Sequence, residues 1–369
     1  MLVPLSPLAR GRLITLAGAL LLCVDTPTFR LLRLNGLPRA SPYFGFGVAV
    51  WRGAVGVAVY ALNAAWHAGS LTALRAQLQQ LGVPVLAATA VLLAASQFAF
   101  TVGVALTSAA NVLVLIALGP LVTALMCRAF LGALLPLHSW VACVAGFMSV
   151  ALVFAGSMDA SSLAGCLVAA GCPLTFGAYL TLSTAKAEVS LAPGMPLSGV
   201  LVALIALLAL GPRASGAAAA DAADGALLIF NAAANAAAQV LVTVGSQTVP
   251  APECVLICLI ETALSPFLVY AVVGEKPSGQ TVAAAVLILL TLGVHAAYDM
   301  HRERKMMAGG AHPEEEGMEL LHARDDGGFD GGEAAGDERV CAAPEQQQQE
   351  ALLRRTDDER ASAASSHSC

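Results

Sequence analysis

The chain has 369 residues, of which 57% are hydrophobic and 12% are charged. A soluble domain carries roughly 25% charged residues, so this composition argues against a soluble protein and indicates a membrane protein. Residues 1–298 hold 11 basic and 8 acidic residues, a net charge of +3, which leaves 8 basic and 17 acidic residues, a net charge of −9, for residues 299–369. The acidic balance therefore belongs to a tail, and we expect no nucleic-acid partner.

Apolar stretches long enough to cross the roughly 30 Å hydrocarbon core as helices recur along the body. Backbone groups cannot stay unpaired in lipid, so these stretches must be helices. The first follows Arg10 and Arg12, and we interpret it as an uncleaved helix rather than a secretory signal. The predicted fold is an all-α membrane protein of about ten transmembrane helices, at residues 13–33, 44–63, 83–104, 107–130, 138–157, 161–184, 196–212, 224–245, 249–273 and 279–298.

The segment between the second and third predicted helices has a different pattern. Apolar residues recur at roughly helical spacing among Arg75 and several glutamines. Two interpretations are open: an amphipathic helix lying in the membrane interface, or a structured loop. The apolar positions are Trp66, Leu71, Leu74, Leu78 and Leu81.

After the last predicted helix the composition changes. Residues 301–369 contain acidic runs and a glutamine run with few aromatic residues, and cannot bury enough apolar surface to fold. The basic cluster Arg302, Arg304 and Lys305 favours a cytoplasmic location for this end. We therefore predict a disordered, acidic, cytoplasmic tail.

Two stretches of the body are alike at an offset of 141 residues. Thr107 corresponds to Thr248, and Leu115-Ile116 corresponds to Leu256-Ile257. Five helices followed by five similar helices cross the membrane in opposite directions, which is an inverted repeat. The predicted division is a first repeat at 1–157, a second at 158–300 and the tail at 301–369.

These stretches resemble the drug/metabolite transporter superfamily, in particular its EamA-type members. The resemblance implies ten helices, both termini in the cytoplasm and a solute path between the two halves. Ala133 stands where the family pattern has a glutamate, and the motifs do not specify a solute. The residues that carry the resemblance are Val50-Trp51-Arg52, Thr107-Ser108-Ala109-Ala110, Phe130-Leu131-Gly132, Glu261 to Pro266, and Gly274-Glu275-Lys276.

Polar side chains inside spans are costly and mark cavities or partners. Asn231, Asn235 and Gln239 are spaced four apart, so they share one face of the eighth predicted helix. This amide stripe either binds a polar solute or holds helices together through hydrogen bonds. Tyr179 and Gln97 complete the candidate solute-binding set, with a purely structural hydrogen bond as the alternative for Gln97.

Two acids are candidates for ion coupling. Glu261, in the middle of the ninth helix, either exchanges a proton or pairs with a fixed cation. Asp25 precedes Pro27, whose ring frees a backbone carbonyl, so it suits an ion site or gate. Alternatively, Asp25 forms an ion pair with Arg52 or Arg30 that only fixes packing. We place Arg52 near the outer end of its helix, where it can reach the interface.

The sequence contains no Gly-x-Ser-x-Gly elbow, phosphate-binding loop or His-Glu-x-x-His motif. We therefore expect no catalytic residues, no metal and no cofactor. The favoured function is a secondary transporter that moves a small polar or amphipathic metabolite by alternating access, with proton coupling as an option. The alternatives are a membrane enzyme acting on a lipid-linked substrate, with Glu261 and Asp25 as acid and base, and an adaptor that recruits partners through its acidic tail. The solute, the membrane of residence and the oligomeric state are not specified by these patterns.

Overall fold

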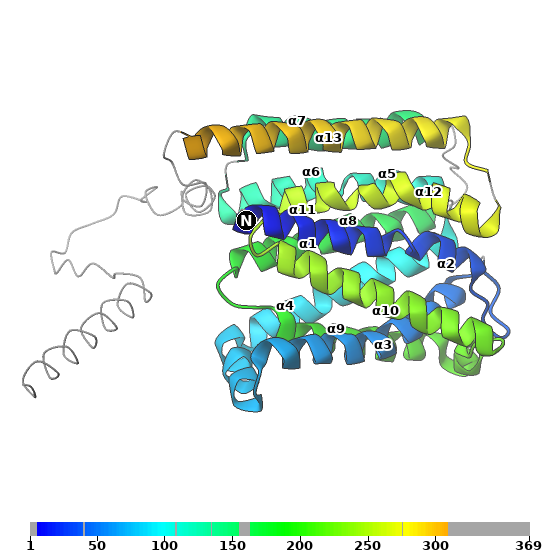
Figure 1. Cartoon of the computed structure of the whole chain (residues 1–369). Coiled ribbons are helices and arrows are strands. Elements are labelled where there is room, and N and C mark those ends of the chain that lie inside the picture. The colour runs from blue at the N-terminus through cyan, green and yellow to red at the C-terminus, as the bar shows by residue number, and fades with distance from the viewer. Residues whose placement is uncertain are drawn as a thin grey trace, which may run out of the picture. The chain divides into compact units, whose positions relative to one another are not determined.

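The computed structural model describes residues 6–39, 41–107, 109–133, 135–154, 163–274 and 276–308. All described residues belong to one compact unit. In the described ranges all regular elements are helical, apart from an isolated bridge between Leu34 and Ala219. The helices are α1 (Pro7–Leu22), α2 (Asp25–Leu31), α3 (Pro42–Ala68), α4 (Leu71–Leu106), α5 (Ala109–Ala117), α6 (Gly119–Met126), η1 (Cys127–Leu131), α7 (Leu137–Phe154), α8 (Leu163–Ala185), η4 (Ala192–Gly194), α9 (Met195–Leu210), η5 (Gly211–Ala217), α10 (Ala222–Gly245), α11 (Ala251–Cys258), α12 (Ile260–Val273) and α13 (Gly279–Ala308) (Figure 1).

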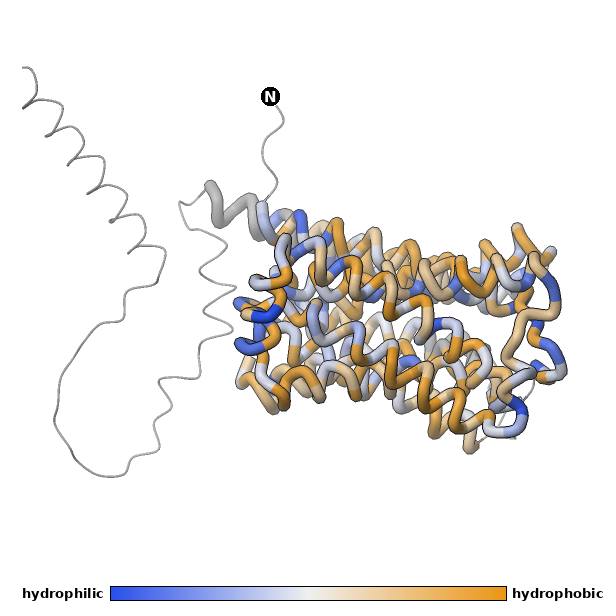
Figure 2. Tube along the Cα trace, turned by 90° about the horizontal axis from the view of Figure 1, so that it is seen from below, coloured by the Kyte–Doolittle hydropathy of each residue, from blue (hydrophilic) through white to orange (hydrophobic). Residues whose placement is uncertain are grey.

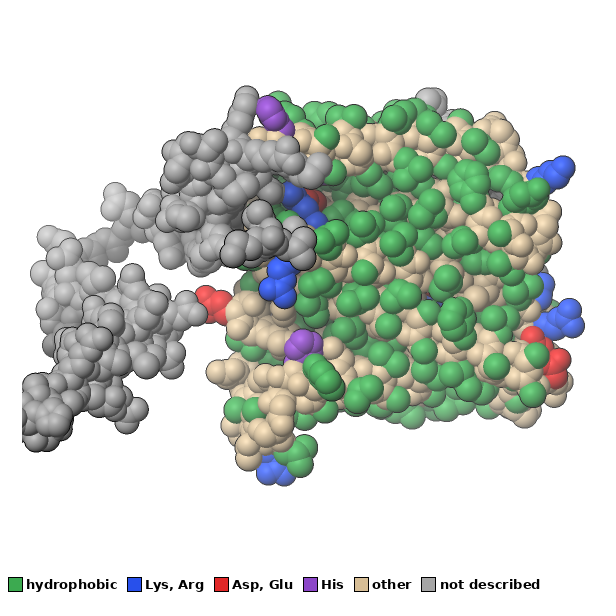
Figure 3. All heavy atoms as spheres, in the orientation of Figure 1, with side chains coloured by type: hydrophobic (Ala, Val, Ile, Leu, Met, Phe, Trp, Pro, Cys, Tyr) green, Lys and Arg blue, Asp and Glu red, His purple; other side chains and the backbone are tan. Residues whose placement is uncertain are grey.

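The described helices have the length and surface of membrane spans. Nine helical segments are long and apolar enough to cross a bilayer, and the shorter Leu137–Ser149 is a further apolar helix. Figure 2 shows hydrophobic residues along the whole length of these helices. Large apolar side chains face outward, such as Leu208, which is 80% exposed, and charged side chains gather at the two ends of the face seen in Figure 3. The prediction of an all-α, multi-pass membrane protein is therefore confirmed.

Several helix boundaries differ from the predicted ones. The first helix begins at Pro7, because Ser6 accepts a hydrogen bond from the Ala9 amide and proline suits the first helical turn. Arg10 and Arg12 therefore lie on the helix and not before it. At the other end, α13 continues to Ala308, so residues 301–308 are helical although we assigned them to the tail. The rest of the predicted tail, 309–369, lies outside the described residues.

The segment predicted as an interfacial helix or a loop is helical from Leu71 onward. Ser70 caps its start by accepting from the Ala73 amide. The helix is interrupted at Gly82, whose φ of 68° and ψ of 160° are accessible to glycine at little cost, and Pro84 follows two residues later. Trp66, at the preceding end of α3, is 83% exposed. The helical alternative is thus the correct one, and its position in the interface stays a prediction.

Three spans are broken inside their apolar stretches. The first separates at Cys23 and Val24 into α1 and α2, the fourth at Leu118 into α5 and α6, and the ninth at Leu259 into α11 and α12. The positions 118 and 259 are 141 residues apart, which is the offset found in the sequence. Broken helices free backbone carbonyls and place helix ends inside the bilayer, so these breaks mark where polar groups can be accommodated.

Small residues allow the helices to approach closely, as is common in membranes. Helix α3 packs on α9, where a Cβ added to Gly53 would lie 2.5 Å from the Ala203 amide nitrogen and 2.6 Å from the Gly199 carbonyl oxygen. Helix α1 packs on α10, where Gly11 and Gly245 have similarly close neighbours. These contacts bring α1, α3 and α10 together around the polar residues described next.

Candidate functional site: a buried polar network

A buried ion pair between Asp25 and Arg52 joins α2 to α3. Asp25 is the first residue of α2, directly after the break in the first span, and both residues are only 4% exposed. Arg52 donates from one terminal nitrogen to Asp25 Oδ1. The alternative in which Asp25 pairs with Arg52 is therefore the one observed, although whether the pair only fixes packing is a separate question.

The expectation that Arg52 reaches the interface is wrong. Helix α3 begins at Pro42, and a rise of about 1.5 Å per residue puts Arg52 roughly 15 Å inside it. The guanidinium is enclosed on all sides. Its three nitrogens donate to Asn231 Oδ1 (3.2 Å), Gln97 Oε1 (3.4 Å) and Asp25, and its central carbon lies 5.8 and 5.3 Å from the ring centroids of Phe29 and Phe100.

The predicted amide stripe on α10 is divided by these contacts. Asn231 donates to Asp25 Oδ1 at 2.7 Å and to Thr28 Oγ1 at 2.6 Å. Asn235 donates to Asp25 Oδ2 at 3.3 Å and accepts from Gln97 Nε2 at 2.6 Å. Two members of the stripe, together with Gln97, thus belong to one hydrogen-bonded network around the ion pair.

Gln239, one turn further along α10, stands apart from that network. Its side chain is 9% exposed, and its Oε1 has no hydrogen-bond partner among the described residues. The next turn carries Thr243, whose hydroxyl donates to the Gln239 backbone oxygen (2.7 Å) and lies 2.8 Å from the hydroxyl of Tyr179. Gln239 is therefore the stripe member whose side-chain oxygen is buried without a hydrogen-bond partner in the described part.

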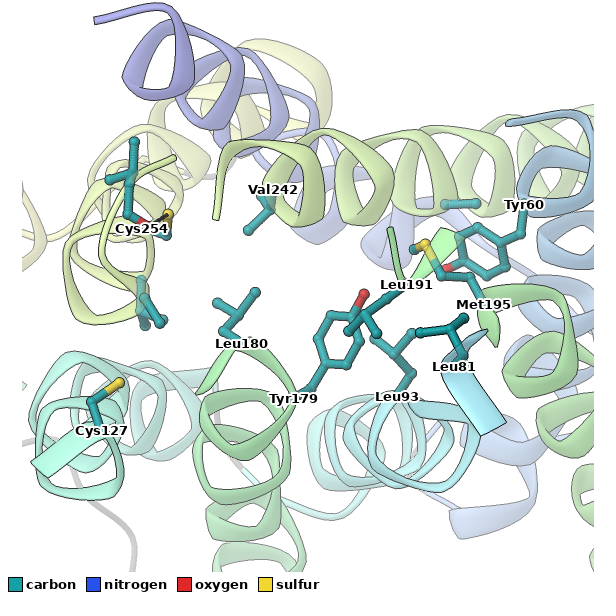
Figure 4. Packing of buried hydrophobic residues seen from close by; sticks show 14 of the residues in the cluster. Tyr60, Leu81, Leu93, Cys127, Tyr179, Leu180, Leu191, Met195, Val242 and Cys254 are labelled. Carbon is teal, nitrogen blue, oxygen red and sulfur yellow. Dashed lines mark hydrogen bonds between the residues drawn. The ribbon is translucent and has the colours of Figure 1, made fainter. Parts of the chain in front are cut away.

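Tyr179 is fully buried on α8, and its ring is surrounded by apolar side chains of the largest core cluster. Figure 4 shows its hydroxyl directed toward α10, while Tyr60 projects from α3 with its hydroxyl directed into the same interior region near Met195. Tyr60 is 4% exposed. Sequence reasoning missed Tyr60 because a tyrosine near the end of a span is typical of the membrane interface.

Glu261 lies beside the break at Leu259, between α11 and α12, which also reaches this region. It is the second residue of α12, two residues after Leu259, and it is partly exposed. Its carboxylate interacts electrostatically with Asp25 and Arg52, but no hydrogen bond or ion pair to it is found within the described ranges. Ser265 donates to the Cys23 backbone oxygen (3.3 Å), which holds α12 against the break between α1 and α2.

A second ion pair joins α1 to α11. Arg12 Nε lies 2.5 Å from Glu253 Oε1, and the two side chains are 20% and 11% exposed. An acidic residue in the first turn of a helix is favoured by the helix dipole, which by itself would account for Glu253. That position is observed, but the pairing with Arg12 is an additional role which depends on the extension of α1 back to Pro7.

The described cysteines are free, and no group of three histidine, cysteine or acidic side chains that could hold a metal ion occurs in the described part of the chain. The site is therefore built from carboxylates, a guanidinium, amides and hydroxyls. Besides Tyr60, the residues that sequence reasoning did not single out are Thr28 and Thr243. A threonine in an apolar helix gives little signal, because its hydroxyl can bond to its own backbone.

Fold and site together define a multi-pass α-helical membrane protein with a charged, amide-rich centre. No protein-family model matches the chain, and no curated protein matches it. Among solved structures, 17 chains match. One of them, described as "Crystal structure of protein", is similar with a TM-score of 0.61 and 18% sequence identity, over 78% of this chain and 98% of that chain. At this identity the similarity shows a shared fold alone.

Proposed function

We propose that the protein is a secondary transporter that moves a small polar or amphipathic metabolite across a membrane by alternating access. The observation that carries this proposal is the buried network around Asp25 and Arg52, with the open carboxylate of Glu261 beside it. A charged side chain at the bilayer centre costs about 2.5–3.5 kcal/mol on insertion scales, so such groups normally serve a solute or ion path. The network alone fits a packing role, but Glu261 lies outside it.

The proposed architecture is two inverted repeats, at 1–157 and 158–300, as in the drug/metabolite transporter superfamily. The paired breaks at Leu118 and Leu259 support it, as do the left-handed glycines Gly132 and Gly274, which end the two broken spans. The helix neighbours also support it. Exchanging α1 with α8, α3 with α9 and α4 with α10 converts the α1–α10 contact into the α4–α8 contact and the α3–α10 contact into the α4–α9 contact, and all four are present.

The geometry disfavours the membrane-enzyme alternative. A general acid or base must reach a substrate proton, but the two carboxylate oxygens of Asp25 already accept from Arg52, Asn231 and Asn235. Glu261 would then act alone. The adaptor alternative depends on residues 309–369, which lie outside the described residues.

For coupling to an ion gradient, the same geometry favours Glu261 over Asp25. A carboxylate that exchanges protons during transport must be accessible at some stage, and Glu261 is partly exposed whereas Asp25 is 4% exposed. We therefore propose Glu261 as the coupling residue and Asp25 as part of the fixed framework. Imposing a pH gradient on vesicles that contain Glu261→Gln tests this, because flux that still follows the gradient would exclude Glu261.

The proposal is tested with the full chain reconstituted in liposomes and a broad panel of labelled metabolites. We expect time-dependent uptake of at least one solute without ATP, and reduced uptake in Gln239→Leu, because Gln239 lies outside the described hydrogen bonds of the network. Absence of flux for the whole panel, with the protein shown to be folded by circular dichroism, would reject the transporter. Deleting residues 309–369 distinguishes the transporter from the adaptor alternative. For a transporter, transport should survive the deletion.

A further inference from the structure

The charged groups of the buried network and the neighbouring Glu261 differ in whether another protein group already pairs with them. Asp25 and Arg52 neutralise one another, and each makes further hydrogen bonds: Asp25 accepts from Asn231 and Asn235, and Arg52 donates to Gln97 and Asn231. Within the described residues, Glu261 has no such partner. The acidic group left for an incoming solute is therefore Glu261.

Arg52 is unavailable to an anion for geometric reasons. Each guanidinium nitrogen already donates a hydrogen bond, and the faces of the group lie within cation–π distance of Phe29 and Phe100. A carboxylate or phosphate is normally bound through two parallel hydrogen bonds from one edge of a guanidinium. Every edge of the Arg52 guanidinium includes at least one nitrogen that already donates a hydrogen bond within the network. Binding an anion there would therefore require these hydrogen bonds to break.

The surroundings of Glu261 contain no other described charge that could balance it. Among the described residues, the other ionisable groups that interact electrostatically with it, beyond Asp25 and Arg52, are Cys23, Cys172 and Cys258. A cation that binds beside a partly buried carboxylate strongly stabilises it, since the low dielectric strengthens the charge pairing.

From these contacts we infer that the central site takes an organic cation, such as a primary or secondary ammonium, and rejects anionic solutes, with Glu261 as the residue that pairs with the ammonium group. The inference rests on the proposed transport function and specifies its substrate class. Gln239 supplies a neutral group: its amide belongs to the same face of α10 as the network, and its Oε1 is buried without a hydrogen-bond partner among the described residues, so a donor of the solute could satisfy it.

The experiment compares solutes that differ only in charge. Amines, uncharged amides and carboxylates built on the same carbon skeletons are offered as labelled solutes to liposomes that contain the full chain. We expect uptake of amines and none of carboxylates. Glu261→Gln should lower amine uptake by about tenfold or more, because a charge pair in a low-dielectric site is lost, while Glu261→Asp, which keeps the charge, should retain the preference for amines.

Glu188→Gln is the matched control, because Glu188 is exposed and lies between α8 and η4, outside the spans. It should leave uptake unchanged. Uptake of carboxylates or amides without amines would overturn the inference and leave the transporter proposal intact. Amine uptake that is unaffected in Glu261→Gln would overturn the role of Glu261, and no uptake in any class would reject the transporter proposal and the inference together.

Discussion

Replacing Asp25 by asparagine removes the charge that balances Arg52 and replaces one acceptor oxygen with a donor. In the native network the two Asp25 oxygens receive hydrogen bonds from Arg52, Asn231 and Asn235. An asparagine has one acceptor oxygen, so at least one of these donors loses its partner. Breaking a buried ion pair from one side costs about 3–5 kcal/mol, because the remaining charge is left uncompensated. We expect that loss in Asp25→Asn and a similar one in Arg52→Met.

The double variant discriminates between a coupled pair and two independent sites. Independent losses would add to about 6–10 kcal/mol. Removing both charges leaves no uncompensated ion, so we expect the double variant to lose at least about 2 kcal/mol less than the sum. Unfolding of the purified protein in mixed micelles, followed by circular dichroism, measures all four species. Additive losses would refute the ion pair as the centre of the network, and Glu188→Gln with Lys186→Met gives the additive, exposed reference pair.

Three further predictions follow from the packing and from the open groups. Gly53→Ala should lower the free energy of unfolding by about 1–3 kcal/mol or more, since its Cβ would collide with backbone atoms of α9. Gly279→Ala is the control and should be neutral, because nothing lies within 4 Å of the added Cβ. Thermal unfolding of the two variants compares them directly. Gln239→Leu should leave stability unchanged or raise it, because an unsatisfied buried oxygen is removed, while solute uptake falls; a large loss of stability would place Gln239 in the framework. Arg12→Glu and Glu253→Arg should each lower the thermal midpoint, and their combination should restore it in part; no recovery would contradict a direct pairing.

The coarse fold was predictable because it follows from composition and length. Lipid requires every backbone group to bond within its own segment, so apolar stretches of about 20 residues determine helices without knowledge of their neighbours. The boundaries were less predictable where polar residues belong to a helix. The first span was predicted from Leu13 because Arg10 and Arg12 interrupt the apolar stretch, but Arg12 is accommodated on α1 by its pairing with Glu253, 241 residues away.

The candidate site was predictable as a set of residues but not as a network. The spacing of Asn231 and Asn235 placed them on one face, and the cost of burial selected Asp25 and Glu261 as unusual, whereas Arg52 was wrongly placed at the interface. Their partners depend on how α2, α3 and α10 meet, and helix spacing within one segment contains no information about that. The same limit explains why Gln239 seemed equivalent to its two neighbours on the stripe, although its buried oxygen has no hydrogen-bond partner among the described residues.

Whether a residue belongs to the hydrogen-bonded network or lies beside it determines which variants can report on transport. Hydrogen bonds connect helices from the two proposed halves of the chain: Arg52 and Gln97 donate to Asn231 and Asn235, and both asparagines donate to Asp25. A substitution in this network therefore perturbs the contact between the halves as well as any solute contact, and its loss of stability and its loss of flux have a common cause. Glu261 and Gln239 lie beside the network without taking part in its described hydrogen bonds. Variants at these two positions should change solute handling while the free energy of unfolding is retained, which makes them the informative positions for testing the proposed transport function.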